Sequence, residues 1–165
     1  MSKYMREMID KVRNFNQLVK ESNGETIVYH ASPNKFDRFD LNKIGDTTDN
    51  GWFGWGMYFF EKKEDALDFS IRFNESNIYE VIVKLGKNLN LTDSSIPNDV
   101  KEVLHENNII VDDIWGVQSF CLENDYNPKI ITKILIGLGY DSLRLGMMDS
   151  VEIIIFNDEN IVKIV

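Results

Sequence analysis

Apolar residues follow a spacing of three to four at the start of the chain and a spacing of two over Tyr79 to Leu85. The first spacing predicts a leading helix over residues 1–22 with one buried face, because positions three and four apart share one side of a helix. Gly24 then ends the pattern. The polar side mixes both charge signs, which favours packing against the core over binding to a membrane surface. The apolar stripe consists of Tyr4, Met5, Met8, Ile9, Val12, Phe15, Leu18 and Val19.

Later in the chain, short β-branched and aromatic runs predict strands that helices interrupt. A glycine-rich and Asp/Asn-rich stretch over 36–56 predicts a long loop, and residues 92–138 predict a mostly helical insertion. Strands and helices without regular alternation favour the α+β class. We expect strands at 26–30, 57–60, 79–85, 140–145, 151–156 and 161–164, and a helix from about Lys63 with Ala66, Phe69, Ser70 and Phe73 on one face.

Length and composition narrow the class of protein. The 165 residues suit one domain, so we treat residues 1–165 as a single unit, and 43% hydrophobic residues are enough to bury a core. The formal net charge of −9, without a Lys/Arg run, argues against a sequence-independent nucleic-acid binder, because phosphate backbones are repelled. The apolar runs are far shorter than a membrane span, and the N-terminus lacks a signal-type apolar segment. We therefore expect a soluble protein of the cytoplasm.

The few thiol and imidazole groups limit the possible metal chemistry. The sequence has one cysteine, Cys121, and two histidines, His30 and His105. One thiol forms neither an internal disulfide nor a multi-thiolate site, so we expect no metal. No basic partner lies near Cys121 in the sequence, and we interpret it as a buried small hydrophobic residue.

Three short segments gain meaning when they are taken together: Tyr29-His30-Ala31-Ser32, Gly54-Trp55-Gly56-Met57-Tyr58-Phe59 and Val151-Glu152-Ile153-Ile154-Ile155-Phe156. In their order along the chain they resemble the ADP-ribosyltransferase family, in the branch of diphtheria-type toxins and poly-ADP-ribose polymerases, whose mark is a His, Tyr, Glu triad. They are similar to that family's His-Gly-Ser/Thr, Gly-x-Gly-x-Tyr-Phe and Glu-Tyr-x-Val-Tyr elements. The resemblance spans about 27–164, and it implies a single-domain fold of split antiparallel β-sheets flanked by helices.

The resemblance implies NAD as co-substrate and a role for each matching residue. His30 would bind a ribose hydroxyl on the adenosine side, and Ala31 would bind the nicotinamide carboxamide through its backbone. Tyr58 and Phe69 would sandwich the nicotinamide ring, since stacked aromatic rings attract beyond simple burial. Glu152 would bind the 2′-hydroxyl of the reacting ribose and stabilise positive charge at C1. His30, Tyr58 and Glu152 are thus the candidate catalytic residues.

Two positions depart from the family's pattern. Ala31 stands where Gly is usual, which keeps the backbone donor and acceptor but narrows the approach of a ligand. Phe69 replaces the usual Tyr, which keeps the stacking face and loses a hydroxyl. The hydroxyl of Ser32 is open to two interpretations, as a cap of the following loop or as a contact to the carboxamide.

NAD carries two phosphate charges, which an acidic protein must offset. Arg38 is our candidate, with Lys43 beside it, and Arg72 and Arg144 are alternatives. The glycine-rich loop also carries Trp52, Phe53 and Trp55, which suit a lid over the nicotinamide, a protein-docking patch or simple anchoring of the loop.

The function we expect is mono-ADP-ribosylation of a macromolecule, most simply a protein. A small modifying enzyme of this family suits a toxin, a phage effector or an anti-CRISPR protein, acting in the host cytoplasm if phage-encoded. The 19 Ile and 17 Asn indicate an AT-rich coding sequence, which favours low-GC bacteria or their phages. Two alternatives stay open: an NAD glycohydrolase that uses water as acceptor, and a non-catalytic inhibitor that retains the fold and binds a partner.

Overall fold

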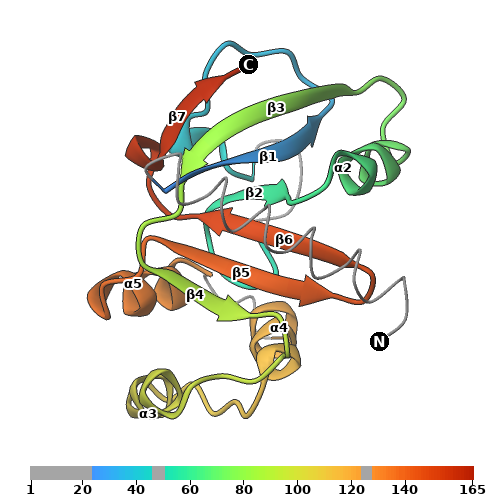
Figure 1. Ribbon diagram of the computed structural model, residues 1–165. Coiled ribbons are helices and arrows are strands. Elements are labelled where there is room, and N and C mark those ends of the chain that lie inside the picture. The colour runs from blue at the N-terminus through green and yellow to red at the C-terminus, as the bar shows by residue number, and fades with distance from the viewer. Residues whose placement is uncertain (1–23, 46–50, 124–127) are drawn as a thin grey trace, which may run out of the picture.

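The computed structural model describes residues 24–45, 51–123 and 128–165, and seven strands within them form one sheet (Figure 1). The strands lie in the order β4-β5-β6-β2-β1-β3-β7. All neighbours are antiparallel except β4 and β5, which are parallel. The strands are β1 Glu25–Ser32, β2 Met57–Phe60, β3 Asn77–Lys84, β4 Asn88–Leu91, β5 Ser142–Met147, β6 Ser150–Ile155 and β7 Ile161–Ile164.

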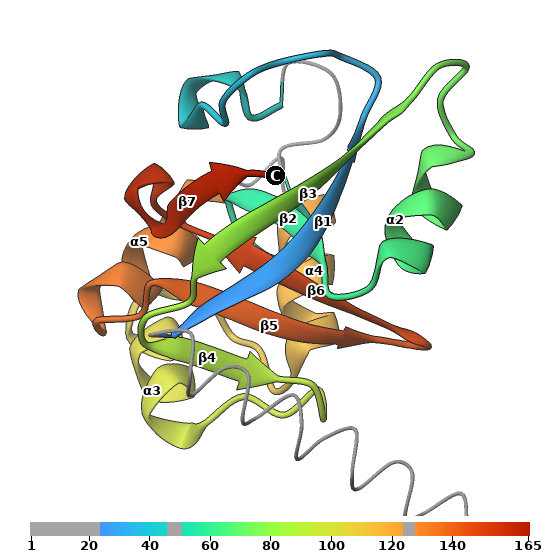
Figure 2. The ribbon, with the colours of Figure 1, turned by 45° about the horizontal axis from the view of Figure 1, so that its top comes forward.

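Helices connect these strands without regular alternation, so the expected α+β class is confirmed. The helix α2 lies beside β1 and β3, away from α3 (Figure 2). The predicted leading helix over 1–22 lies outside the described residues. The helices are α2 Lys63–Ser70, α3 Asn98–Glu106, α4 Ile114–Glu123 and α5 Lys129–Gly137, with 3-10 turns η1 Leu41–Lys43 and η2 Asp158–Asn160.

Two apolar clusters cover opposite faces of the central strands. Ile153 and Ile155 of β6 belong to one cluster, whereas Ile154 and Phe156 belong to the other. Successive side chains of a strand point to opposite faces, so a strand covered on both sides carries a continuous apolar run. The second cluster continues into α3, α4 and α5 through Val100, Leu104, Ile114, Ile131 and Leu135.

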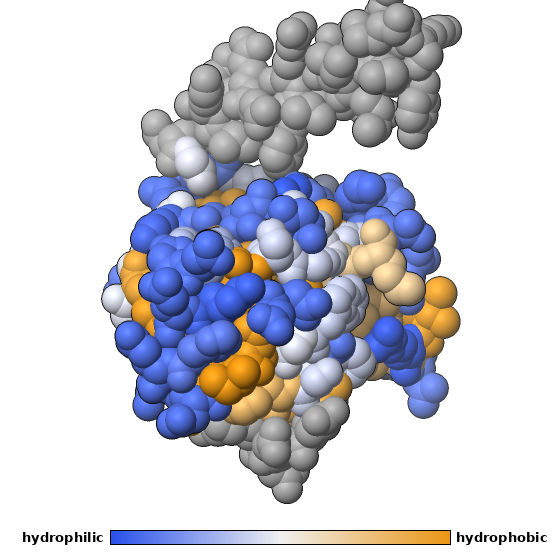
Figure 3. All heavy atoms as spheres, turned by 90° about the horizontal axis from the view of Figure 1, so that it is seen from below, coloured by the Kyte–Doolittle hydropathy of each residue, from blue (hydrophilic) through white to orange (hydrophobic). Residues whose placement is uncertain are grey.

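The surface at the end of the molecule seen from below is mostly hydrophilic, with separate hydrophobic patches (Figure 3). Among the exposed apolar residues of the helical part are Ile110, Trp115 and Leu122. Within the described ranges, no helix has the length and apolar character that crossing a membrane requires.

The ladder between β1 and β2 positions the site described below. These strands share one register pair, Tyr29 with Phe60, whereas β1 and β3 pair along the whole of β1. The end of β1, from His30 to Ser32, therefore has β3 on one side and no register partner on β2. The short β1–β2 ladder is where this single sheet comes nearest to the split sheets that the family resemblance implies.

Some element boundaries differ from the sequence predictions. The helix α2 ends at Ser70, so Phe73 lies in the turn that follows. The strand β4 was not predicted, because Asn88-Leu89-Asn90-Leu91 lacks β-branched residues and its pairing to β5 is not local in sequence. The predicted loop over 36–56 contains the short turn η1, which the Asp40 side chain caps by accepting from the Asn42 N–H.

Candidate functional site

A cavity of about 570 Å³ lies between the end of β1, the strands β2 and β6, and the loop that joins β1 to β2. That volume falls in the range of small-molecule sites, roughly 300–1,000 Å³. All seven residues that the sequence analysis assigned to the site line this one cavity. They are His30, Ala31, Ser32, Arg38, Tyr58, Phe69 and Glu152.

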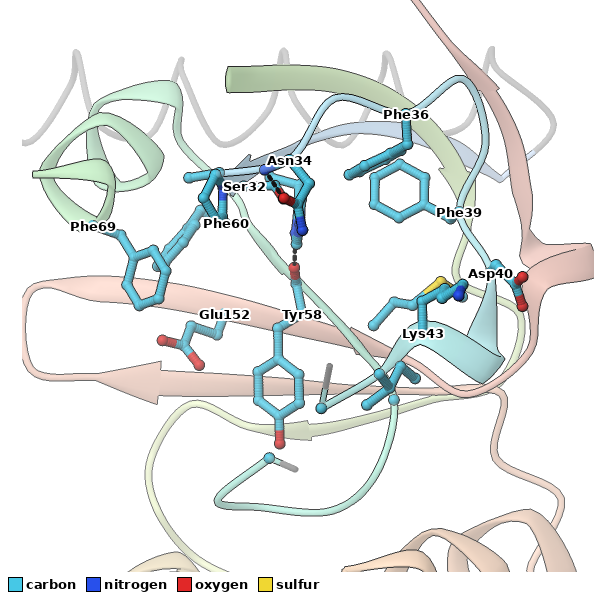
Figure 4. Close-up of a pocket in the computed structure, with 18 of the residues that line it drawn as sticks. Ser32, Asn34, Phe36, Phe39, Asp40, Lys43, Tyr58, Phe60, Phe69 and Glu152 are labelled. Carbon is cyan, nitrogen blue, oxygen red and sulfur yellow. Dashed lines mark hydrogen bonds between the residues drawn. The ribbon is translucent and has the colours of Figure 1, made fainter. Parts of the chain in front are cut away.

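Strand register brings the predicted aromatic residue and the predicted carboxylate to one face. Glu152 pairs directly with Phe60, and Tyr58 pairs with Ile154 two positions further along β6. Paired residues in an antiparallel ladder share a face, so Tyr58, Phe60 and Glu152 stand on the same side of the sheet. Figure 4 shows the Glu152 carboxylate between the rings of Tyr58 and Phe69.

The imidazole of His30 bonds to the backbone of the neighbouring strand. Its Nδ1 lies 2.7 Å from the carbonyl oxygen of Tyr58 (Figure 4). A carbonyl only accepts, so Nδ1 carries the proton, and Nε2 of the neutral ring is left as an acceptor. This side-chain bond also accounts for the short β1–β2 ladder, because the Tyr58 carbonyl is satisfied without a β1 amide.

Aromatic rings surround His30 and affect its ionisation. Phe39 lies edge-on with its ring centroid 5.2 Å away, and Phe59 lies 5.7 Å away. Burial lowers the pKa of His30 below its usual value, and the hydrogen bond to the Tyr58 carbonyl offsets part of that shift. The imidazole is therefore neutral at pH 7, which keeps Nε2 an acceptor.

The hydroxyl of Tyr58 is held by the glycine-rich loop. It donates to the carbonyl of Gly54 at 2.7 Å and accepts from the N–H of Phe53 at 3.2 Å. Gly51 packs directly against this hydroxyl, with φ at +94°. A Cβ at Gly51 would lie 2.7 Å from the Tyr58 hydroxyl oxygen and would also clash with the Gly54 carbonyl. Glycine is required there both by space and by backbone conformation.

The same loop is anchored on its other side to α5. Thr132 Oγ1 donates to the carbonyl of Trp55 at 2.7 Å, and the Trp55 N–H donates to the Pro128 carbonyl at 3.3 Å. Phe53 is buried in the apolar cluster of the helical part, whereas Trp52 is 41% exposed and lines the cavity. Of the three loop aromatics, Phe53 and Trp55 thus anchor the loop, and Trp52 and Phe53 both line the cavity.

Phe69 reaches the cavity from α2. Its ring centroid lies 5.4 Å from that of Phe60, and the guanidinium of Arg72 lies 4.6 Å from the Phe69 centroid. An Arg over an aromatic face is an attractive cation–π arrangement. Arg72 is exposed and lines the cavity beside Phe69.

The remaining predicted cations differ in their surroundings. Arg38 and Lys43 line the cavity near Asp40. Hydrogen bonds from the backbone and side chain of Asn42 lower the pKa of Asp40, and the charges of Arg38 and Lys43 lower it further. Arg144 does not line the cavity, because its Nη2 lies 2.9 Å from both carboxylate oxygens of Glu61.

The structure favours one of the two interpretations of Ser32. Its Oγ accepts from the N–H of Asn34 at 3.1 Å, which closes the turn after β1. Ala31 and Ser32 are both buried. Elsewhere, burial raises the pKa of the Cys121 thiol to about 11, as befits a packed and unreactive cysteine.

Sequence analysis missed three aromatic residues of the cavity: Phe36, Phe39 and Phe60. Phe60 had a usable signal, because it follows Tyr58 by two positions in a strand and so shares its face. Phe36 and Phe39 had none, since they lie in an irregular loop. There, Phe36 stacks on Tyr79 of β3 with ring centroids 4.2 Å apart.

The arrangement suits a flat aromatic ligand that develops positive charge. A carboxylate lies between two aromatic rings, and a neutral imidazole acceptor lines the same cavity. Within the described ranges, no group of three or more His, Cys, Asp or Glu side chains is arranged to hold a metal ion.

Comparison with known proteins gives one family. No sequence among the curated proteins matches this chain. A crystal structure of an anti-CRISPR protein is similar at a TM-score of 0.44 and 17% identity, over 81% of this chain and 91% of that one. The model of a family described as ADP-ribosyltransferase in polyvalent proteins matches residues 21–165, nearly the whole chain. By that match, the chain belongs to this ADP-ribosyltransferase family.

Proposed function

We propose that this protein transfers a single ADP-ribose unit from NAD to a protein target. The observation that carries the proposal is the Glu152 carboxylate between the rings of Tyr58 and Phe69, in the same cavity as His30. Membership of the family supports the reaction class. The protein that accepts ADP-ribose and the residues that bind NAD are our inference from the cavity.

In the proposed reaction, the bond between C1′ of the ribose and the nicotinamide nitrogen breaks, and nicotinamide leaves with the electron pair. A nucleophilic atom of the target then bonds to C1′ and loses its proton. The intervening state resembles an oxocarbenium ion, so catalysis depends on a nearby negative charge. Glu152 supplies that charge and accepts a hydrogen bond from the 2′-hydroxyl.

Binding of NAD is divided along the cavity. Tyr58 and Phe69 hold the nicotinamide ring, and the backbone of Ala31 binds its carboxamide. The Nε2 of His30 accepts from a ribose hydroxyl on the adenosine side, which its neutral tautomer permits. Arg38 offsets the pyrophosphate charge from the loop after β1.

The setting we propose is that of an effector, such as a toxin, a phage protein or an anti-CRISPR protein, acting in a bacterial cytoplasm. The isoleucine-rich and asparagine-rich composition supports a low-GC bacterial or phage source. Under this proposal the target is a host protein.

Incubation with NAD labelled in the adenylate phosphate, together with a bacterial lysate, tests the reaction. We expect one or a few protein bands to become labelled, with release of nicotinamide in equal amount. Nicotinamide release without labelled protein would replace the proposal by the glycohydrolase reaction. A parent protein that binds NAD and produces neither would favour the non-catalytic inhibitor.

A further inference from the structure

Glu61, the residue after β2, contacts both the strand that carries Glu152, β6, and the neighbouring strand β5. Its N–H donates to the carbonyl of Val151 on β6 at 3.0 Å. Its carboxylate accepts from Arg144 of β5, whose Nη2 lies 2.9 Å from both oxygens. The residue that follows β2 is therefore bonded to β6 and β5 next to the candidate catalytic carboxylate.

The ion pair lies behind Glu152. Arg144 pairs in register with Ile153, whereas Glu152 pairs with Leu145 and Phe60. Since neighbouring positions of a strand face opposite ways, Arg144 and Glu61 lie on the reverse face of β6 from the Glu152 side chain. The pair joins β2 to β5 across the backbone of β6.

Glu152 lies where the β2–β6 ladder ends. Phe60 with Glu152 is the last register pair of that ladder, and β6 begins only two residues earlier, at Ser150. The turn that joins β5 to β6 contains Met148, which is 92% exposed and has a φ of +48°. On the β5 side the ladder continues to the pair of Met147 with Ser150, but on the β2 side it ends at Glu152. Strand ends next to exposed turns open most easily, so a contact from the β2 side would hold this part of β6.

The burial of the ion pair suits such a constraint. The side chains of Arg144 and Glu61 are 28% and 18% exposed. A charge-assisted bond at this burial is screened less than an exposed pair and holds its geometry better. In contrast, the ion pair of Lys84 with Glu25 spans 3.8 Å, and its lysine side chain is 52% exposed.

We propose that Glu61 and Arg144 are positioning residues that fix the carboxylate of Glu152 by holding β6 from behind. The proposal rests on the proposed function, in which Glu152 acts on the reacting ribose. A carboxylate that must stabilise charge at one carbon atom is sensitive to displacement, and an error of about 1 Å costs about a hundredfold in rate. The ion pair acts through the β6 backbone and does not touch NAD.

Substitution of either partner tests this assignment. Glu61→Gln keeps the shape and loses the charge, and Arg144→Met removes the donor. We expect each to lower kcat for nicotinamide release by about ten- to a hundredfold, with the Kd for NAD changed less than about threefold. Arg144→Lys should restore part of the rate. Lys84→Met, which removes the exposed pair, is the matched control and should leave kcat unchanged.

The double variant, with Glu61→Gln introduced into Glu152→Gln, distinguishes a positioning role from general destabilisation of the protein. Glu61→Gln acts through the Glu152 carboxylate, so it should cause no further loss of rate once that charge is absent. An equal loss of rate in both backgrounds would overturn the proposal, as would an unchanged kcat in both Glu61→Gln and Arg144→Met.

A measurement that does not depend on enzyme activity tests the positioning role independently of the proposed function. Hydrogen exchange of the β6 amides near Glu152 should be faster in Glu61→Gln than in the parent, with the β3 amides unchanged. If the parent neither transfers nor hydrolyses NAD, the proposed function fails, and the exchange experiment still decides on the ion pair. Unchanged exchange across β6 would overturn the positioning role by itself.

Discussion

The two walls of the cavity are built in different ways. Tyr58, Phe60 and Glu152 stand on β2 and β6, where register pairs fix the backbone of each. Arg38 and Asp40 come from the loop after β1, where one capped 3-10 turn provides the local order. A ladder with an apolar cluster on each face holds atoms more firmly than a polar loop with exposed charges. We call the side formed by Tyr58, Phe60 and Glu152 the strand wall, and the side formed by Arg38 and Asp40 the loop wall. We expect the chemical step to depend on the strand wall and the affinity for NAD to be adjusted by the loop wall.

The largest expected effect is on the strand wall. Glu152→Gln should lower ADP-ribose transfer by about a hundredfold or more, because the lost charge acts on the transition state. The fold and most of the NAD affinity should remain, since Gln keeps the shape and a carbonyl acceptor. Labelling of a target and calorimetric titration with NAD measure the two quantities. Glu159→Gln, an exposed carboxylate outside the cavity, is the control. Transfer at the parent's rate in Glu152→Gln would remove Glu152 from its proposed role.

The two proposed stacking rings differ in how firmly they are held. Tyr58 is fixed by its strand and by two hydrogen bonds to its hydroxyl, whereas Phe69 stands on the last turn of α2. Tyr58→Ala should therefore weaken NAD binding by about tenfold, about 1.4 kcal/mol, and Phe69→Ala by less. The shift of the melting temperature on adding NAD gives the comparison. Equal NAD-induced shifts in both variants and in the parent would contradict the stacking model.

The loop can be displaced from Tyr58 without changing that ring. In Gly51→Ala the added Cβ would clash with the Tyr58 hydroxyl and the Gly54 carbonyl. Gly24→Ala imposes a similar backbone strain at φ +79°, and among the described residues no atom lies within 4 Å of the added Cβ, so it is a matched control. We expect Gly51→Ala to weaken NAD binding severalfold, and Gly24→Ala to alter only stability, by about 1 kcal/mol. Equal NAD affinities in the two variants would show that the contact of Gly51 with Tyr58 does not affect the binding of NAD to the strand wall.

The imidazole that borders both walls gives a pH dependence. Burial lowers the pKa of His30, so the unfolded chain takes up a proton more readily than the native protein does. His30 therefore lowers stability as pH falls from about 6.5 through its native pKa, and has no effect on the slope above that range. Protonation also removes the Nε2 acceptor, so NAD affinity should fall in the same window. The free energy of unfolding and the NAD affinity are measured between pH 5 and 8 for the parent and for His30→Gln. An identical pH dependence in both proteins would refute the assignment.

The smallest expected effect is on the loop wall. Arg38 is exposed, and exposed charges in water contribute little and are screened by salt. Arg38→Ala should weaken NAD binding by about two- to threefold at low salt and less at high salt, with kcat unchanged. Calorimetry at two salt concentrations measures this, and Lys63→Ala, outside the cavity, is the control. A loss of kcat in Arg38→Ala would place part of the chemistry on the loop wall.

Local patterns in the sequence determined much of this protein. Short β-branched and aromatic runs identified β2 and β6, and three motifs in order identified His30, Tyr58 and Glu152, which line one cavity although 122 residues separate the first from the last. These features can be predicted because strand-forming runs and the spacing within each motif depend only on residues that are close together in the chain. Their proposed roles in binding and catalysis remain predictions.

Tertiary structure decided what local patterns do not contain. Arg144 is equivalent to Arg38 as a cation in the sequence, yet pairing of β5 with β6 sets it behind Glu152 against Glu61. Phe39 comes to pack against His30 through an irregular loop. Such contacts depend on strand register and on the order of strands in the sheet, which arise from packing between residues distant in the chain. For that reason the sequence predicted the candidate residues His30, Tyr58 and Glu152, and only the fold decided which further residues line the cavity and what holds them in place.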